Sequence, residues 1–361
     1  MRVTWKVLVL LPYRQLHHVS GGAERLVFSE QARVIIVAHN SRRWLGNCLR
    51  SLHSLHGMAA VVLIDNGENE GIGESSDTYP YVLTLKTPYT LPFSEANNFA
   101  LVNGGLDGEF VCFLNQDTIS REDWLSACLT IMKNDEDVGA VIPLIENYDG
   151  TAWDEAFLTC SRAAPELYDR VSQGVNAHFD DLPSFIEVPE ITAAAMVVRT
   201  EALLKAGPFD PIYGSYYEDY DLCRRISSVG YKVGICTRGR VGHFGGSATT
   251  NRQAFLRRAR WIARNRVIYA ARWKWKSRIG GLVRYITWEM PRNAARAALG
   301  RSAIPFQAFL CAHLDLVSLL PRLVSTRRDR LAWNNYLRHI GWPAVVERRS
   351  SHMPETRSPT G

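Results

Sequence analysis

Short apolar runs, each followed by polar residues, recur along the first 250 residues. The clearest is 110–114, five apolar residues before Asn115, Gln116, Asp117 and Thr118. An unbroken run of this length predicts a strand buried on both faces of a parallel sheet. The same pattern predicts further strands at residues 33–39, 60–66, 81–86, 138–142, 191–198, 232–236 and 240–243.

Helical spacing of apolar residues alternates with these runs. It predicts helices at residues 44–55, 93–102, 124–132, 201–206 and 218–226. Ser94 is a plausible N-cap for the second of these helices. The alternation of strand and helix predicts an α/β fold, a Rossmann-like sandwich with a mostly parallel sheet. Ligands in such sheets bind beyond the carboxyl ends of the strands, so we expect Asp117 and Asp65 at the ligand edge.

Two stretches depart from this alternation. Residues 146–189 show no steady period, and we interpret them as a variable excursion, either a lid or an acceptor-side loop. From residue 251 onward, long helices rich in Arg and Trp are predicted. We therefore divide the chain into a poorly defined leader (1–32), a catalytic domain (33–250), a basic helical region (251–349) and a disordered tail (350–361).

Charge separates the two main parts. Residues 251–361 contain 22 Lys and Arg against 5 Asp and Glu, a net charge of +17, whereas residues 1–250 carry −11. Such asymmetry suggests an anionic surface as partner. Trp residues interleaved with Arg favour binding of this region to a membrane interface. The alternatives are that it is a helical subdomain packed on the catalytic body, or that it binds nucleic acid. No nucleic-acid module is recognisable.

The cysteine and hydropathy patterns indicate the cellular compartment and whether the chain spans a membrane. The seven cysteines form no C-x-x-C pair, which predicts reduced core thiols in a cytosolic protein and no zinc or disulfide framework. Residues 304–324 are the best candidate for a membrane span, but Gln307, His313, Asp315, Pro321 and Arg322 interrupt them. We expect no span.

Candidate chemistry lies at the ends of separate elements. Asp117 and His243 would suit one divalent cation shared with a substrate phosphate. Asp219, beside Glu218 in the first turn of a predicted helix, would suit a general base. The alternatives are an Asx turn at Asp117, a satisfied loop histidine, and a capped helix start.

Seven stretches together resemble one family. They are residues 34–52, 62–67 (VLIDNG), 92–98 (PFSEANN), 114–118 (LNQDT), 207–210 (GPFD), 217–225 (YEDYDLCRR) and 241–247 (VGHFGGS). In this order they look like the inverting family 2 glycosyltransferases of GT-A fold, in the rhamnosyltransferase- and galactofuranosyltransferase-like branch. The resemblance covers residues 33–248.

The resemblance implies a role for each candidate residue. Asp219 would be the catalytic base, and Glu218 would orient it or bind acceptor. Mg²⁺ or Mn²⁺ would be bound by Asp117 and His243. The remaining implied residues hold the donor nucleotide (His39, Asn40, Asp65, Asn66, Asn97, Asn98, Asn115 and Asp117) or line the acceptor side (Tyr216, Tyr217 and Asp221).

The implied substrates are a nucleotide-diphospho-sugar, for example dTDP-rhamnose or a UDP-sugar, and a glycan or polyprenyl-linked acceptor in cell-surface polysaccharide synthesis. The implied location is cytoplasmic, with salt-sensitive peripheral attachment to the inner face of the plasma membrane. Two departures stand out. Asn115 replaces the first acid of the family's D-x-D motif, and residues 191–196 lack a usual glycine. An inactive binding or scaffold subunit of the same fold is therefore the alternative.

Overall fold

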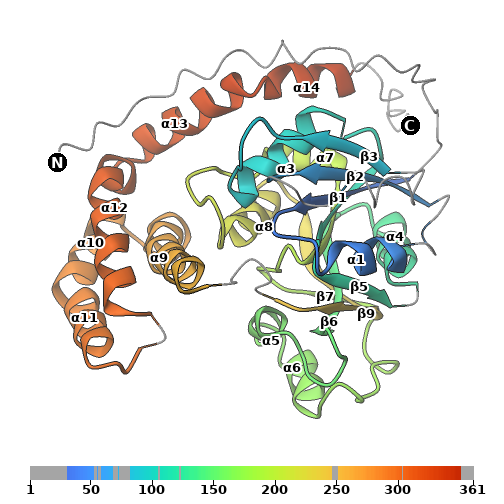
Figure 1. Ribbon diagram of the computed structural model, residues 1–361, viewed down its shortest axis with the longest axis horizontal. Helices are drawn as coiled ribbons and strands as arrows, with labels where there is room; N and C mark the ends of the chain where they lie inside the picture. Colours follow the sequence, from blue (N-terminus) through green and yellow to red (C-terminus); the bar gives the residue numbers. More distant parts are fainter. Residues whose placement is uncertain are drawn as a thin grey trace, which may run out of the picture.

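A nine-stranded mixed sheet forms the centre of the molecule (Figure 1). The computed structural model describes residues 31–52, 55, 58–67, 72, 82–104, 106–121, 123–245, 251–302 and 304–350. The strand order is β3-β2-β1-β4-β8-β6-β9-β5, with β7 paired to β9. The strands are β1 (Ala32–Ala38), β2 (Ala59–Asp65), β3 (Val82–Lys86), β4 (Phe110–Asn115), β5 (Thr118–Arg121), β6 (Val138–Asn147), β7 (Phe185–Glu187), β8 (Ala195–Arg199) and β9 (Lys232–His243).

Strands β3, β2, β1 and β4 run parallel to one another, as the sequence predicts. β8 then pairs antiparallel with both β4 and β6, and β6 is parallel to β9. The first five residues of β4 are all buried, because the strand lies inside the sheet with helices on both faces. The carboxyl ends of β1, β2 and β4 therefore lie at one edge, where the sequence placed the ligand.

Helices cover the sheet, and four of the five predicted ones agree with the structure to within two residues at each end, whereas the first ends at Ser51 and not at residue 55. In the catalytic part they are α1 (Leu45–Ser51), α3 (Phe93–Val102), α4 (Trp124–Asn134), α5 (Glu155–Ser161), α6 (Pro165–Ser172), α7 (Thr200–Ala206) and α8 (Glu218–Ser228). The α/β prediction is confirmed.

Three local predictions are wrong. Ser94 does not cap α3: Pro92 holds the N-cap position, and the Ser94 hydroxyl is buried one residue inside the helix. Residues 146–189, in which no regular element was expected, contain α5, α6 and β7. The two short strands predicted after residue 231 are one strand, β9, whose register against β6 shifts between Pro143 and Leu144. Residues 1–30 of the predicted leader and residues 351–361 of the predicted tail lie outside the described residues.

The helical region forms a lobe beside the sheet and then an arm across it (Figure 1). Its elements are α9 (Arg252–Tyr269), the π-helical turn η2 (Ala270–Lys274), α10 (Arg278–Arg284), the π-helical turn η3 (Tyr285–Glu289), α11 (Met290–Ala298), α12 (Phe306–Val324), α13 (Thr326–His339) and α14 (Trp342–Ser350). Ile340, Trp342 and Val345 enter the same hydrophobic core as β1 and β4. The arm thus packs on the catalytic body.

Candidate active site

The ends of β1, β2 and β4 are tied together by side chains. Gln116, just after β4, accepts a hydrogen bond from the backbone N–H of His39 at 2.6 Å and donates one to its carbonyl at 2.7 Å. The Nδ1 atom of His39 lies 3.2 Å from the carbonyl oxygen of Asn66. These contacts hold the loops after three strands in one rigid edge, and Asp117 is buried beside them.

His243 brings β9 to the same edge. Its Nε2 atom lies 3.5 Å from Oδ1 of Asp117 and 3.1 Å from Nδ2 of Asn115. Its Nδ1 atom lies 3.0 Å from Oδ2 of Asp154. Burial alone would lower the pKa of His243, but hydrogen bonds to Asp117 and Asp154, and their charges, raise it to about 9.

Asp154 is a site residue that the sequence reasoning missed. Its Oδ1 atom caps α5 by accepting hydrogen bonds from the N–H groups of Ala156 and Phe157, while Oδ2 holds His243. The signal was present as an acidic N-cap at the start of a short helix, but it lay within the stretch interpreted as irregular.

The arrangement fits a divalent cation shared with a substrate. A carboxylate that fixes Nδ1 of a metal-binding histidine leaves Nε2 free to ligate, and here Nε2 faces Asp117. Oxygen and imidazole nitrogen ligands suit Mn²⁺, and oxygen suits Mg²⁺. No group of three or more His, Cys, Asp or Glu side chains in the described part of the chain forms a metal cage. The remaining ligands would come from a substrate phosphate and from water.

A second acidic pair begins α8. Glu218 is buried, and its Oε2 atom has no hydrogen-bond partner. Asp219 accepts hydrogen bonds from the N–H groups of Ala193 at 3.1 Å and Tyr220 at 2.9 Å. Burial raises the pKa of Asp219 to about 6 despite these bonds. Burial and the neighbouring Asp219 charge raise the pKa of Glu218 well above its usual range.

The two acidic clusters share the segment before β8. The carbonyl of Ala194 accepts a hydrogen bond from the N–H of Asn115, while the N–H of the adjacent Ala193 donates to Asp219. The alanine-rich segment that departs from the family pattern thus connects the end of β4 to the start of α8.

The helical region clamps the loop that precedes Asp219. Tyr216 and Tyr217 both adopt left-handed backbone conformations, with φ of 70° and 72°, which are strained for residues other than glycine. The buried Asn265 on α9 donates hydrogen bonds from Nδ2 to the carbonyls of Tyr213, Ser215 and Tyr216. A helix outside the predicted catalytic domain therefore supports the loop that carries the predicted base.

Two family models match the chain. "Glycosyl transferase family 2" matches residues 33–185, and "Glycosyl transferase family group 2" matches residues 110–333, which is more than half of the chain. The chain belongs to glycosyltransferase family 2. It is a glycosyltransferase, and the predicted GT-A fold and the rhamnosyltransferase-like branch agree with this assignment.

Two curated relatives of this glycosyltransferase carry rhamnosyltransferase names. The chain is 22% identical over 250 residues to rhamnosyltransferase WbbL of Escherichia coli, covering 66% of this chain and 92% of that protein. It is 26% identical over 198 residues to the N-acetylglucosaminyl-diphospho-decaprenol L-rhamnosyltransferase of Mycobacterium tuberculosis, covering 48% of this chain and 62% of that protein. The match thus spans less than two thirds of the mycobacterial relative.

Similar solved structures include two that contain Mn²⁺. The mannosyltransferase PcManGT of Pyrobaculum calidifontis, in complex with GDP-Man and Mn²⁺, has a TM-score of 0.49 and 16% identity over 87% of this chain and 86% of that chain. GalNAc-T7 with UDP, GalNAc and Mn²⁺ has a TM-score of 0.47 and 18% identity over 67% of this chain and 50% of that chain.

Several donor residues predicted for this glycosyltransferase have structural partners. The Asn66 amide bonds both backbone groups of Leu91, Asn97 donates to the carbonyl of Phe93, and Asn98 joins the backbone of Phe209 to the Tyr336 hydroxyl. These hydrogen bonds give the three amides structural partners, and their part in donor binding stays a prediction.

Of two other predicted donor residues, Asp65 is the last residue of β2 and Asn40 lies just beyond the end of β1, with its Nδ2 atom 3.2 Å from Nε2 of His39. The Oδ1 atom of Asp65 is buried without a hydrogen-bond partner, while Oδ2 lies 3.6 Å from Lys86. Asn40 is exposed in a left-handed conformation with φ of 53°. Both residues stand at the carboxyl ends of their strands, as predicted.

Asp221 does not face an acceptor. It is fully buried, and its carboxylate contacts Arg225 at 2.8 Å, Arg272 at 3.3 Å and the Trp273 indole at 2.9 Å. Arg272 also pairs with Asp210 and Asp329, at 2.9 and 2.7 Å. The structure therefore gives Asp221 a place in an ion-pair network between α8 and the helical region, unlike Tyr216 and Tyr217, which stay half-exposed.

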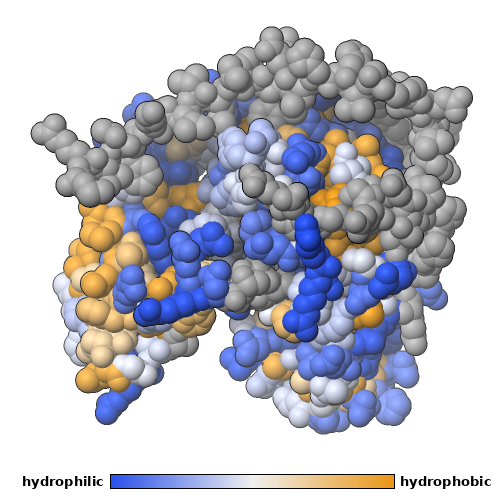
Figure 2. Space-filling model, in the orientation of Figure 1, coloured by the Kyte–Doolittle hydropathy of each residue, from blue (hydrophilic) through white to orange (hydrophobic). Residues whose placement is uncertain are grey.

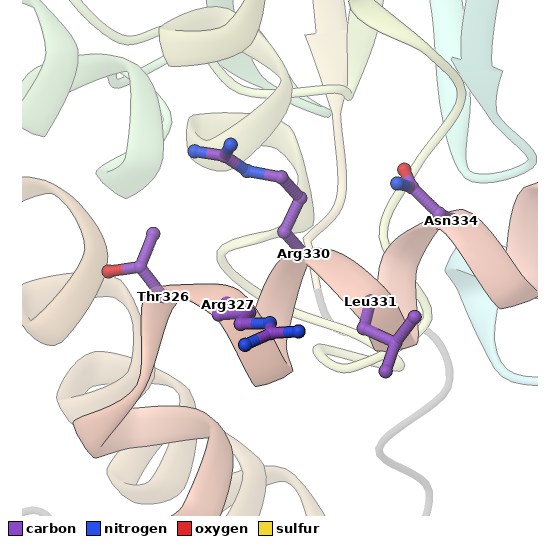
Figure 3. Close-up of a pocket in the computed structure, with 5 residues that line it drawn as sticks. All are labelled: Thr326, Arg327, Arg330, Leu331 and Asn334. Carbon is purple, nitrogen blue, oxygen red and sulfur yellow. The ribbon is translucent and has the colours of Figure 1, made fainter.

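The pocket in Figure 3 is separate from this site. A hollow of about 450 Å³ is lined by five residues of α13, none of which is a predicted site residue: Thr326, Arg327, Arg330, Leu331 and Asn334. We therefore assign it no part in the transfer chemistry.

Proposed function

We propose that the protein is an inverting glycosyltransferase that moves a sugar from a nucleotide-diphospho-sugar to a glycan or lipid-linked acceptor in cell-surface polysaccharide synthesis. The observation that carries the proposal is the pairing of two clusters through residues 193–194: Asp117 with His243 on one side, and Asp219 on the other. Similarity to the two named rhamnosyltransferases favours dTDP-rhamnose as donor, with a UDP-sugar as the alternative.

Asp219 would act as the general base. A carboxylate whose pKa is raised to about 6 by burial is still ionised near neutral pH and is a stronger base than an exposed one. It would remove the proton from the acceptor hydroxyl as that oxygen attacks C1 of the sugar, on the face opposite the departing diphosphate. Attack from that face inverts the anomeric configuration. Glu218, whose pKa is raised by burial and by the Asp219 charge and whose Oε2 atom has no hydrogen-bond partner, would orient the base or bind the acceptor.

The donor diphosphate would lie at the ends of β4 and β9. Asp117 and His243 would hold one Mg²⁺ or Mn²⁺ there, and Asp154 would fix the orientation of the His243 ring. When bound, such an ion neutralises charge on a leaving diphosphate. Asn115 removes one negative charge compared with a D-x-D motif. We interpret this as a subtype, because Asp117 and His243 remain in place.

The nucleoside would lie at the ends of β1 and β2. The unpaired Oδ1 of Asp65 is a hydrogen-bond acceptor that an N–H or O–H group of the nucleoside could satisfy. His39 and Asn40 stand on the neighbouring strand end, and Tyr216 and Tyr217 would contact the acceptor. The proposed location is the cytoplasmic face of the plasma membrane, where polyprenyl-linked acceptors would be accessible.

The alternative, an inactive subunit that only binds nucleotide-sugar, predicts binding without turnover. A panel of purified dTDP- and UDP-sugars, each with Mg²⁺ or Mn²⁺, separates the two. Release of nucleoside diphosphate that depends on one donor supports the enzyme, whereas binding of a donor with no release and no transfer supports the inactive subunit.

A further inference from the structure

One face of α12 is apolar and exposed along its whole length. Leu314 is 72% exposed and Val317 is 68% exposed, near the middle of the helix. With 3.6 residues per turn, the exposed apolar residues form a single stripe: Phe306, Leu310, Leu314, Val317, Leu320 and Val324. Side chains of this kind rarely form a continuous exposed stripe on a soluble protein unless something covers them.

A second stripe lies on the neighbouring segment. Ile279 and Val283 on α10 and Ile286 on η3 follow helical spacing, and Trp288 on η3 is 71% exposed. α10 and α11 both contact α12. Figure 2 shows the lobe that contains these helices as a broad apolar surface, in contrast to the largely polar catalytic body. We call Ile279, Val283, Ile286 and the α12 stripe the α10–α12 face.

Unpaired basic residues flank this face. Arg292, Arg296 and Arg301 lie between η3 and the start of α12, and Arg327 follows its end; all four are exposed and have no carboxylate partner among the described residues. Residues 276–330 contain ten Lys and Arg but three Asp and Glu. Each of those three acids is in an ion pair with an arginine. The net positive charge beside the apolar surface matches an anionic surface.

The buried side of α12 indicates how the helix would lie. That side packs on α9, where Asp315 pairs with Arg260 at 2.5 Å. His313 lies 2.7 Å from the hydroxyl of Tyr285 on η3. α12 is long and apolar enough to cross a membrane by length and composition. Crossing would break these contacts and bury Asp315 in hydrocarbon, which is costly. A helix lying in the plane of the interface keeps them.

We propose that the α10–α12 face docks on an anionic lipid bilayer, with α12 lying in the plane of the headgroup region and its exposed stripe inserted below the headgroups. The flanking arginines meet anionic headgroups. The contact goes beyond the proposed transfer chemistry and would stand even if the acceptor were a soluble glycan. It also adds an apolar component to the salt-sensitive attachment that charge alone predicts.

Vesicle flotation with the full chain tests this proposal. The probes are vesicles of phosphatidylcholine with phosphatidylglycerol, and vesicles of phosphatidylcholine alone. We expect flotation with the anionic vesicles and weaker flotation with the neutral ones. High salt should reduce binding, because each arginine near an anionic surface contributes about fivefold, but salt should not abolish it.

The decisive variant is Leu314→Glu with Val317→Glu. It removes two apolar side chains from the middle of the stripe and should lower the partition coefficient at least about tenfold. The matched control is Gln307→Glu with Ser318→Glu, which adds the same two charges to exposed polar positions of the same helix and should lower binding much less. Leu83→Glu, on the exposed edge strand β3, should bind as the unmodified chain does.

The outcomes are distinct. Unchanged flotation of the Leu314→Glu/Val317→Glu variant, or no flotation of the unmodified chain, overturns the proposal. So does a dimer in light scattering that this variant converts to a monomer, since a second copy would then cover the face. Resistance of the bound chain to alkaline carbonate overturns the in-plane geometry. Transfer to a water-soluble acceptor should be unaffected in the variant, so failure of docking is separable from failure of the proposed function.

Discussion

Replacement of Asp219 by Asn is predicted to lower catalysis and to change the pH dependence of stability. Loss of a positioned general base typically costs 10²–10⁴ in rate, so kcat for transfer should fall by at least about 10². Donor binding should survive, because the Asp117 and His243 cluster is untouched. The pH profile of kcat/KM for the unmodified enzyme should rise through about pH 6, the pKa of Asp219, and the variant should lose that limb.

The stability effect follows from the same pKa. The carboxyl titrates near pH 6 in the folded chain and near 4 in the unfolded one. The folded state therefore keeps a proton that the unfolded state releases, and this group lowers stability as pH rises through that window. A shift of about two pH units corresponds to about 3 kcal/mol, of which about 2 kcal/mol develops between about pH 4 and pH 7.

Asn cannot titrate, so the variant avoids this loss. Its amide can accept only one of the two backbone hydrogen bonds from Ala193 and Tyr220, which costs about 1 kcal/mol at every pH. The variant should be slightly less stable than the unmodified chain near pH 4 and more stable near pH 7. Denaturant midpoints at the two pH values measure this crossover. Near-normal turnover, or parallel pH dependences of stability, would refute the assignment of Asp219.

Three further predictions concern the parts that surround the base. EDTA should abolish transfer and Mg²⁺ or Mn²⁺ should restore it; full activity in chelator would contradict the metal site. Asp117→Ala should weaken metal-dependent donor binding more than His243→Ala, because it removes a charge as well as a ligand. Asn265→Ala should lower kcat by about tenfold or more while sparing donor affinity, because the loop before α8 loses three hydrogen bonds; unchanged kcat would show that the loop holds itself. Arg272→Met should destabilise the fold by about 3–5 kcal/mol, because the buried carboxylates of Asp210 and Asp221 lose this partner. Arg260→Met breaks a more exposed ion pair and should cost about 1 kcal/mol or less. Denaturant midpoints measure both free energies of unfolding.

The parts of the fold that were predictable are those where a single element determines the pattern. The run before Asn115 is apolar because β4 is buried on both faces, and α3 has the predicted bounds because its apolar face packs on the sheet. The ends of the parallel strands could be assigned to one edge from topology alone, which placed Asp65 and Asp117 correctly.

What could not be predicted depends on partners distant in sequence. Asp154 becomes a site residue only because α5 places it against His243, 89 residues away. Asp221 looks like an exposed acid in an acidic motif, but Arg272 from the helical region buries it. The sequence predicts that the Asn98 amide binds a ligand. In the structure its Nδ2 donates to the Phe209 carbonyl and the Tyr336 hydroxyl, and its Oδ1 accepts from the Phe209 N–H. Side chains of these types serve structure or chemistry equally well, and only tertiary contacts separate the two.

Contacts of α9 with the loop before α8 cross the predicted domain boundary near residue 250. A cut near residue 250 would remove Arg264 and Asn265, which donate hydrogen bonds to the carbonyls of Ile212, Tyr213, Ser215 and Tyr216. These contacts predict that truncation there would disturb the acceptor side and the base.

The most direct test of inverting transfer is the anomeric configuration of the product. The purified full-length chain would be incubated with dTDP-β-L-rhamnose, or with the UDP-sugar selected by the donor panel, a polyprenyl-diphosphate-linked acceptor and Mg²⁺ or Mn²⁺, and the new linkage would be assigned by NMR. We predict a glycoside of the configuration opposite to that of the donor sugar, formed by the unmodified chain and reduced at least about 10² in Asp219→Asn. A product with retained configuration, or bound donor that is never transferred, would contradict the proposed function.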